Sequence, residues 1–261
     1  MEFGQTQSAD HRTAASFLAP LAPRAHRPAA EGSDNVLLRE FGQAVQVRLL
    51  RSSTLVTFSK DAVLAKGGAP METILFPESG MLALCTSSDK GPGLDGLLVG
   101  REGAVGLAEG MSDAPAPWSC HALSAGAAWA APAELVAELL RWDPAAANAA
   151  WRYMARLGAQ QHRALACGAL HSGYARLARL LLEWSEHTGS ERLTLTQERL
   201  SMILGLRRTT VTLLMGQLVE ADVIDTGRGR IVLRDRQALE ERSCSCRTAQ
   251  VSAPASSRAR P

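Results

Sequence analysis

The sequence has no long hydrophobic run and few aromatic residues. No apolar segment approaches the roughly 18 residues that a membrane-spanning helix needs, and residues 1–23 lack the continuous apolar core of a signal peptide. These absences predict a cytoplasmic protein. Aromatic residues make up only 5% of the 261 residues, but hydrophobic residues make up 46%, which is enough for compact domain cores.

Cysteine is also scarce, and its spacing excludes a disulfide framework. The chain has an odd number of cysteines, scattered and without a Cys-x-x-Cys pair: Cys85, Cys120, Cys167, Cys244 and Cys246. The Cys-x-Cys at 244 and 246 would suit a metal or redox role, but the simpler interpretation is an unpaired pair in a loose tail. Cys120 is interpreted as a small buried apolar residue.

The sequence predicts neither an enzyme nor a metal site. It contains no nucleophile–base pair and no phosphate-binding loop. Its histidines at 121, 162 and 171 do not have the i, i+4 spacing that would place two of them on one helix face as metal ligands. We therefore expect no cofactor.

The charge of the chain is nearly balanced, with a formal net charge of +2. This value neither supports nor excludes nucleic-acid binding, because a local basic patch matters more than the total. The basic residues are mostly Arg, and no Lys follows Lys90. Arginine favours forked contacts with phosphate and guanine.

Changes in composition divide the chain into five parts. Residues 1–34 are rich in Ala, Pro, Arg and Ser and predict a disordered tail, as do residues 244–261. Between them we expect a β-domain at 35–140, a long helix at 141–170 and a helical domain with a hairpin at 171–243.

The first ordered part has the pattern of short strands. Brief apolar runs are separated by turn sequences such as Gly67-Gly68 and Pro77-Glu78-Ser79-Gly80, which favours an antiparallel roll or barrel. The expected strands are Leu55–Phe58, Ala62–Ala65, Ile74–Phe76, Met81–Cys85, Leu97–Val99 and Ala127–Ala131.

From Pro132 the pattern becomes helical. After Asp143-Pro144 the chain has no proline until Pro254, and a seam of residues follows a spacing of three and four: Trp151, Met154, Gly158, Gln161 and Leu165. This seam suits a helix that packs against the same helix of a second copy. A helix that faces the core of its own chain is the alternative. A further helix is expected from Tyr174 to Glu186, ending at Gly189.

The segment 196–224, TQERLSMILGLRRTTVTLLMGQLVEADVI, predicts a helix-turn-helix. Thr196 can cap the first helix, and Gly205 can supply the turn that ends it. The second helix, beginning near Arg207, places Val211, Leu214 and Leu218 on one apolar face. Two short helices joined by a glycine turn are typical of this motif.

The second helix opens with residues suited to DNA. Its N-terminal end would enter the major groove. There we expect Arg208, Thr209 and Thr212 to contact bases. Phosphate contacts are expected from Arg207, Thr210, Thr196 and Arg230. Arg230 lies in Ile224–Leu233, whose glycine turn predicts a hairpin wing.

At this point the sequence resembles the Crp/Fnr family of bacterial regulators, from about residue 35 to 246. Its most specific segments are the helix-turn-helix with its wing, ILFPESGMLAL at 74–84, VGREGAVGL at 99–107 and RDRQALEERSCSC at the end. The resemblance implies an α+β protein: an N-terminal antiparallel β-roll of the cyclic-nucleotide-binding type, a long dimerisation helix and a C-terminal winged helix-turn-helix. It also implies a homodimer on double-stranded DNA, in contact with RNA polymerase.

The sequence departs from the family where cyclic AMP binds. Members that bind it hold the phosphate with a Gly-Glu pair and an Arg-Ser/Thr pair. Here the corresponding segments read Gly106-Leu107-Ala108-Glu109 and Pro117-Trp118-Ser119-Cys120, without an Arg. The candidate pocket residues are therefore Gly106, Leu107, Glu109, Trp118, Ser119 and Cys120, for an unknown small-molecule effector. Trp118 lines the pocket or fills the core, and Glu109 shapes the entrance or is solvated.

Two further departures concern the metal cluster and the DNA sequence that is read. The oxygen-sensing members carry an N-terminal cysteine cluster for iron–sulfur, and no Cys precedes Cys85 here. Arg208 matches the arginine with which family members contact a base. The next position is acidic in the family and is Thr209 here. A later position is Arg in the family and is Leu213 here.

We therefore predict a homodimeric regulator that depends on neither cyclic AMP nor an iron–sulfur cluster. The alternative is a ligand- or redox-sensing module whose winged helix docks on protein.

Overall fold

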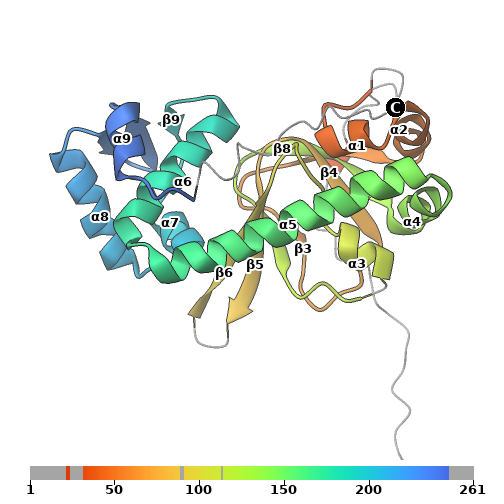
Figure 1. Cartoon of the computed structure of the whole chain (residues 1–261), viewed down its shortest axis with the longest axis horizontal. Helices are drawn as coiled ribbons and strands as arrows, with labels where there is room; N and C mark the ends of the chain where they lie inside the picture. The colour runs from red at the N-terminus through yellow and green to blue at the C-terminus, as the bar shows by residue number, and fades with distance from the viewer. Residues whose placement is uncertain (1–21, 24–31, 89–90, 113, 247–261) are drawn as a thin grey trace, which may run out of the picture.

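A long helix joins a β-roll to a small helical domain in this computed structural model, which describes residues 22–23, 32–88, 91–112 and 114–246 (Figure 1). The helix is α5 (Pro144–Leu170). Its 27 residues give it a length of about 40 Å, and Figure 1 shows it running in front of the roll toward the helical domain.

The roll consists of two antiparallel four-stranded sheets. One sheet has the order β1-β2-β8-β4 and the other the order β3-β7-β5-β6. The strands are β1 (Ala22–Pro23), β2 (Thr54–Phe58), β3 (Val63–Ala65), β4 (Thr73–Ser79), β5 (Leu82–Ser88), β6 (Gly91–Val99), β7 (Ser119–Ala122) and β8 (Gly126–Pro132). The six strands expected from the sequence are all present, whereas β1 and β7 were not among those expected.

Side chains from the two sheets form the core of the roll, and strand alternation decides which ones. Leu82 and Leu84 of β5 point between the sheets. Met81 and Ala83, one residue out of phase, lie on the other face and pack against the C-terminal domain. Strand β5 thus contributes to two cores.

Four helices flank the roll: α1 (Val36–Glu40), α2 (Gln43–Arg51), α3 (Leu107–Ser112) and α4 (Ala133–Trp142). Residues 43–51, which precede the first expected strand in a segment predicted to be a β-domain, form the helix α2. Its Val45, Leu49 and Leu50 recur at helical spacing and are buried.

The C-terminal domain contains α6 (Gly173–Thr188), β9 (Arg192–Leu193), α7 (Gln197–Leu204), α8 (Arg208–Glu220), β10 (Ile224–Gly227), β11 (Arg230–Leu233) and α9 (Arg236–Arg242). Its three strands form a sheet in the order β10-β11-β9. Gly189 ends α6 in the left-handed conformation, as the sequence predicts. In the part of the chain described here, no helix combines the length and the apolar character that crossing a membrane requires.

The terminal tails differ from expectation where the structure describes them. Most of 1–34 and 244–261 lies outside the described residues. However, Ala22–Pro23 pair with β2, and Asp34 donates its N–H to Glu78 at 2.9 Å. Cys244 is buried against the end of α5. The interpretation of Cys244 and Cys246 as a loose pair was therefore wrong, because their segment packs on α5 and α6.

Asn35 joins three segments of the roll. Its Oδ1 accepts from the N–H of Leu38 at 2.9 Å and so caps α1, while its Nδ2 donates to the carbonyls of Pro77 and Gly103 at 2.9 and 2.8 Å. The side chain is completely buried. Because no water can replace these bonds, their loss leaves buried polar groups unsatisfied.

We predict that Asn35→Ala lowers the free energy of unfolding by about 2–4 kcal/mol, measured by urea denaturation. Asp34→Ala, at the exposed neighbouring position, is the control and should change stability by less than about 0.5 kcal/mol. Equal effects of the two substitutions would contradict the linking role of Asn35.

Candidate DNA-binding site

The helix-turn-helix is formed by α7 and α8, and local signals define each boundary. Thr196 caps α7, since its Oγ1 accepts from the N–H of Arg199 at 3.2 Å. Gly205 ends α7 at φ 62°, a left-handed conformation that costs glycine little. Buried Leu200, Leu204 and Val211 hold the two helices together.

The start of α8 is exposed and cationic. Arg207 occupies the N-cap without a side-chain hydrogen bond to the backbone of the helix. Arg207, Arg208 and Thr209 are exposed, and Thr210 is half-buried. The first N–H groups of a helix have no acceptor within it and carry a partial positive charge. This end of α8 therefore combines two guanidinium groups with backbone donors.

Thr212 lies one turn further along α8 and is held in place. Its hydroxyl contacts Gln197 Oε1 at 2.8 Å and the carbonyl of Arg208 at 3.0 Å. Leu213 beside it is 63% exposed, which is unusual for a large apolar side chain. Sequence reasoning noted Leu213 only as a departure from the family, although it follows Thr209 by four residues and therefore shares its helix face.

The wing is the hairpin of β10 and β11. Gly227 pairs with Arg230, and the turn between them has Gly229 at φ 67°. Arg230 is exposed. An ion pair between Asp225 and Arg234 joins the two strands at the base of the wing. The structure thus places the predicted DNA-contacting residues at the start of α8, at the cap of α7 and on the wing.

The predicted effector pocket is only partly formed by the predicted residues. A cavity of about 210 Å³ lies between the roll and α5. Of the six candidates, four line it: Gly106, Leu107, Glu109 and Trp118. Ser119 accepts from the N–H of Gly67 at 3.0 Å instead, and Cys120 lies in the core between the sheets.

The pocket lining is largely apolar and without a cation. None of the described residues that line it is Arg or Lys. Its carboxylate, Glu109, accepts from the indole N–H of Trp118 at 2.9 Å, so Trp118 both lines the pocket and closes one side of it. The opposite wall comes from α5 and includes Met154, Gly158 and Gln161 of the predicted seam.

The seam of α5 is exposed at some positions, while its Met154 packs against the core of the roll. Trp151 and Leu165 are 64% and 75% exposed, and Gln161 is exposed as well. The inner side of the helix is buried through Ala146, Ala149 and Tyr153. Exposed Trp151 and Leu165 therefore suit a partner helix, whereas Met154 fits the alternative of a helix that faces the core of its own chain.

One group of residues was missed by the sequence reasoning. Cys167, His171, Cys244 and Cys246 come together at the end of α5. The histidines had been compared only with one another. The spacing of Cys167 and His171, four residues apart at the end of the long helix, was a signal that could have been found.

Comparison with known proteins identifies the class of the C-terminal domain first. Residues 175–242 match the family model described as a Crp-like helix-turn-helix domain. Comparison with curated protein sequences gave no match.

Solved structures extend the similarity to the whole architecture. FixK2 from Bradyrhizobium japonicum is 19% identical with a TM-score of 0.65, and the match covers 74% of this chain and 98% of FixK2. TTHA1359, a Crp/Fnr-family transcriptional regulator from Thermus thermophilus, is 23% identical with a TM-score of 0.63, covering 72% and 97%. CLP from Xanthomonas campestris, a regulator responsive to c-di-GMP, is 15% identical with a TM-score of 0.64, covering 73% and 98%.

The chain thus has the fold of these Crp/Fnr-type regulators, and its residues 175–242 match a Crp-like helix-turn-helix domain. The resemblance and the fold class predicted from the sequence are confirmed.

Burial makes Cys120 chemically inert. It is fully buried between the sheets, and desolvation of the thiolate raises the pKa of Cys120 to about 12. Because the thiolate is the reactive form, this raised pKa lowers the reactivity of Cys120 at neutral pH. We predict that iodoacetamide leaves Cys120 unmodified in the folded protein and alkylates it in denaturant, as read by peptide mass spectrometry. Rapid modification of Cys120 in the folded state would contradict this placement.

Proposed function

We propose that this protein is a homodimeric, sequence-specific DNA-binding regulator of transcription. The observation that carries the proposal is the exposed start of α8, where Arg207, Arg208 and Thr209 project from the helix end that carries the free N–H groups. A protein-docking helix needs no such group of cations, whereas phosphate and guanine bind them directly.

The residues around α8 suit different parts of a DNA duplex. Arg208 and Thr209 are proposed to contact base edges, together with Thr212. Leu213 is added to them, because an exposed apolar side chain can contact a thymine methyl group. Arg207, Thr210, Thr196 and Arg230 are proposed to contact phosphates, which position the helix but carry no sequence information.

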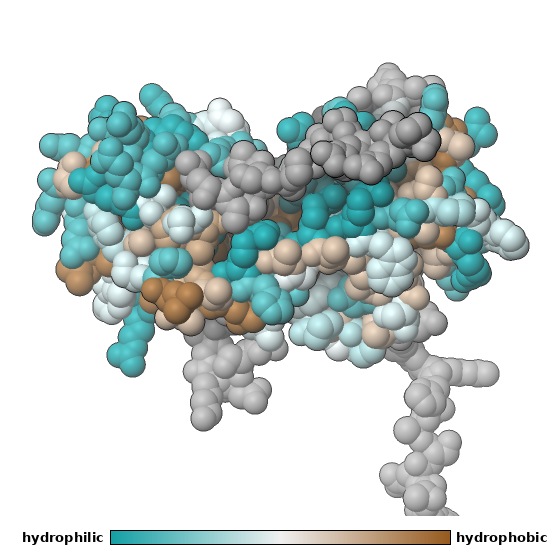
Figure 2. Space-filling model, in the orientation of Figure 1, coloured by the Kyte–Doolittle hydropathy of each residue, from teal (hydrophilic) through white to brown (hydrophobic). Residues whose placement is uncertain are grey.

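The exposed seam of α5 supports a homodimer. Trp151 and Leu165 are large apolar side chains left in solvent, and Trp142 at the end of α4 is exposed as well. Figure 2 shows apolar atoms along the line of α5, while hydrophilic atoms cover much of the outer winged-helix domain. Pairing α5 with its copy would bury this seam and place two recognition helices on one duplex.

The pocket supports an effector other than cyclic AMP. A cyclic phosphate buried in this cavity would lack a cation among the described lining residues, and Glu109 would add a like charge. A neutral effector fits better. It would contact the roll and the α5 seam together, since both contribute to the lining.

A role as a DNA-binding regulator of transcription also implies a cellular location, a further partner and the absence of catalysis. The protein acts in the cytoplasm, contacts RNA polymerase and catalyses no reaction. No iron–sulfur cluster is proposed, because the cysteines begin only at Cys85.

Arg208 gives the sharpest test of base reading. We predict that Arg208→Ala weakens binding to the specific site by about 1–3 kcal/mol and relaxes discrimination at one base pair. The measurement is a binding titration against all single-base variants of the site. Site preference unchanged by the substitution would contradict the assignment.

Arg230→Ala is the matched comparison, since it removes the same side chain from the wing. It should weaken binding about equally for all sequences and reduce the slope of log affinity against log salt by about one.

The seam can be tested on α5 itself. We predict that Leu165→Glu yields monomers at micromolar concentration in light scattering, because two buried carboxylates would face each other in the dimer. Ala159→Glu adds the same charge at an exposed position on a different side of α5 and should leave the dimer intact. A monomeric wild type, or a dimeric Leu165→Glu protein, would contradict the proposed interface.

A further inference from the structure

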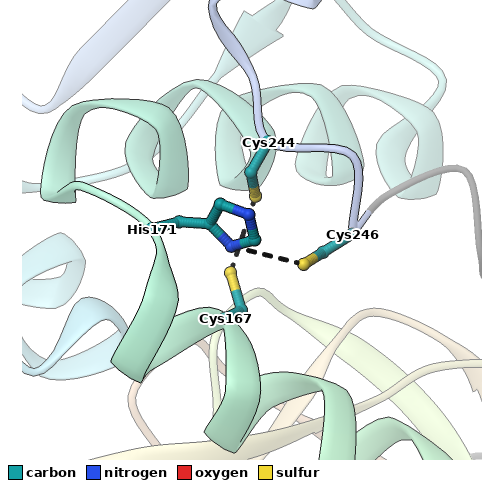
Figure 3. A group of neighbouring side chains, drawn as sticks. All are labelled: Cys167, His171, Cys244 and Cys246. Atoms are coloured by element: carbon teal, nitrogen blue, oxygen red, sulfur yellow. Dashed lines mark hydrogen bonds between the residues drawn. The ribbon is translucent and has the colours of Figure 1, made fainter.

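Three cysteines and one histidine converge where α5 ends (Figure 3). Cys167 lies in the last turn of α5 and His171 directly after it, while Cys244 and Cys246 follow α9. The four ligand atoms, one sulfur or ring nitrogen from each side chain, all lie within 4.8 Å of one another. The fold thus brings together two pairs of residues far apart in the sequence.

Local structure aims both pairs at the same point. The N–H of His171, the C-cap of α5, donates to the carbonyl of Cys167 at 3.1 Å and so holds the two residues together at the end of the helix. The segment after α9 is held beside them, because the N–H of Cys244 donates to the carbonyl of Ala175 in α6 at 3.4 Å. Figure 3 shows the four side chains pointing toward one another from these two segments.

The spacing matches the ligand shell of one tetrahedral metal ion. The sulfurs of Cys167 and Cys244 are 3.5 Å apart, and the sulfur of Cys246 is 3.6 Å from Nδ1 of His171. Zinc–sulfur bonds of about 2.3 Å in a tetrahedron place the ligand atoms about 3.8 Å from one another. All the cysteines are free thiols, so no disulfide accounts for the proximity.

We propose that Cys167, His171, Cys244 and Cys246 bind a zinc ion that fastens the end of the winged-helix domain to the end of α5. Three thiolates and one imidazole form a donor set that zinc prefers. Because four protein ligands fill the tetrahedron and leave no open position, the ion is structural rather than catalytic.

The compactness of the group argues for a single ion rather than an iron–sulfur cluster. In such a cluster the thiolates bind different iron atoms and are separated by the cluster itself. Ligand atoms that lie within 4.8 Å of one another leave no room for it.

The surroundings suit a structural metal. Cys167 and Cys244 are only 1% and 6% exposed, which shields the bonds from water. Arg179 of α6 acts on Cys244 electrostatically and lines a cavity beside the site together with Cys167 and Cys246. Its positive charge, shared with Glu183 at 2.7 Å, offsets part of the negative charge of three metal-bound thiolates.

The test uses the full chain without a polyhistidine tag, purified under reducing conditions. We expect one zinc per chain by elemental mass spectrometry. Replacing zinc with Co²⁺ should give the intense visible bands of tetrahedral cobalt with thiolate ligands. A strong zinc chelator should lower the Tm of the wild-type protein, since metal binding stabilises the folded state.

Two variants and one control make the test specific. Cys246→Ser and His171→Ala should each weaken zinc binding at least tenfold in competition with a chromogenic chelator. Cys246 is only half-buried, so its variant retains the fold, as circular dichroism can verify. Cys85→Ser removes a buried cysteine in the roll and should bind zinc like the wild type.

The proposal is overturned if the wild type binds neither zinc nor tetrahedral Co²⁺, if it contains iron with acid-labile sulfide, or if Cys246→Ser and His171→Ala bind zinc with wild-type affinity. These readouts do not involve DNA. Their failure is therefore distinguishable from failure of the proposed function.

Discussion

The packing of α5 against the roll is the constraint on which the rest of the structure depends. Tyr153 is its anchor: the hydroxyl donates to the carbonyl of Ala104 at 2.7 Å and accepts from the N–H of the same residue at 2.9 Å. Gly103 makes this approach possible, because a Cβ at that position would lie 2.4 Å from the tyrosine oxygen. With its inner side held in this way, α5 leaves Trp151 and Leu165 exposed and leads to the winged-helix domain at its far end.

Strand β5 makes the second connection between the two halves. Its inward residues belong to the roll, and Met81 and Ala83 on its other face pack into the core of the C-terminal domain. Arg199 of α7 also pairs with Asp61 of the roll at 2.7 Å, although an ion pair with one exposed partner contributes little. Burial of apolar side chains therefore sets the position of the helix-turn-helix relative to the roll.

Sequence reasoning succeeded where the determinants are local. The cap Thr196, the turn glycine Gly205 and the apolar spacing of α8 each act within a few residues, and all were recognised. Strand β7 was not, because SCHA at 119–122 has little strand character of its own and is defined by pairing with β5 and β3. The group of Cys167, His171, Cys244 and Cys246 was missed for the same reason, since Cys167 and Cys244 are 77 residues apart and the packing of α9 and the following segment on α6 brings them together.

The central claim is that α8 reads DNA as part of a dimer, and selection from a random DNA library tests it most directly. The protein is bound to the library at about 0.15 M salt, which suppresses purely ionic binding. We predict recovery of a near-palindrome whose half-sites lie about one helical turn apart. Recovery of no sequence motif would contradict the claim and would favour a winged helix that docks on protein.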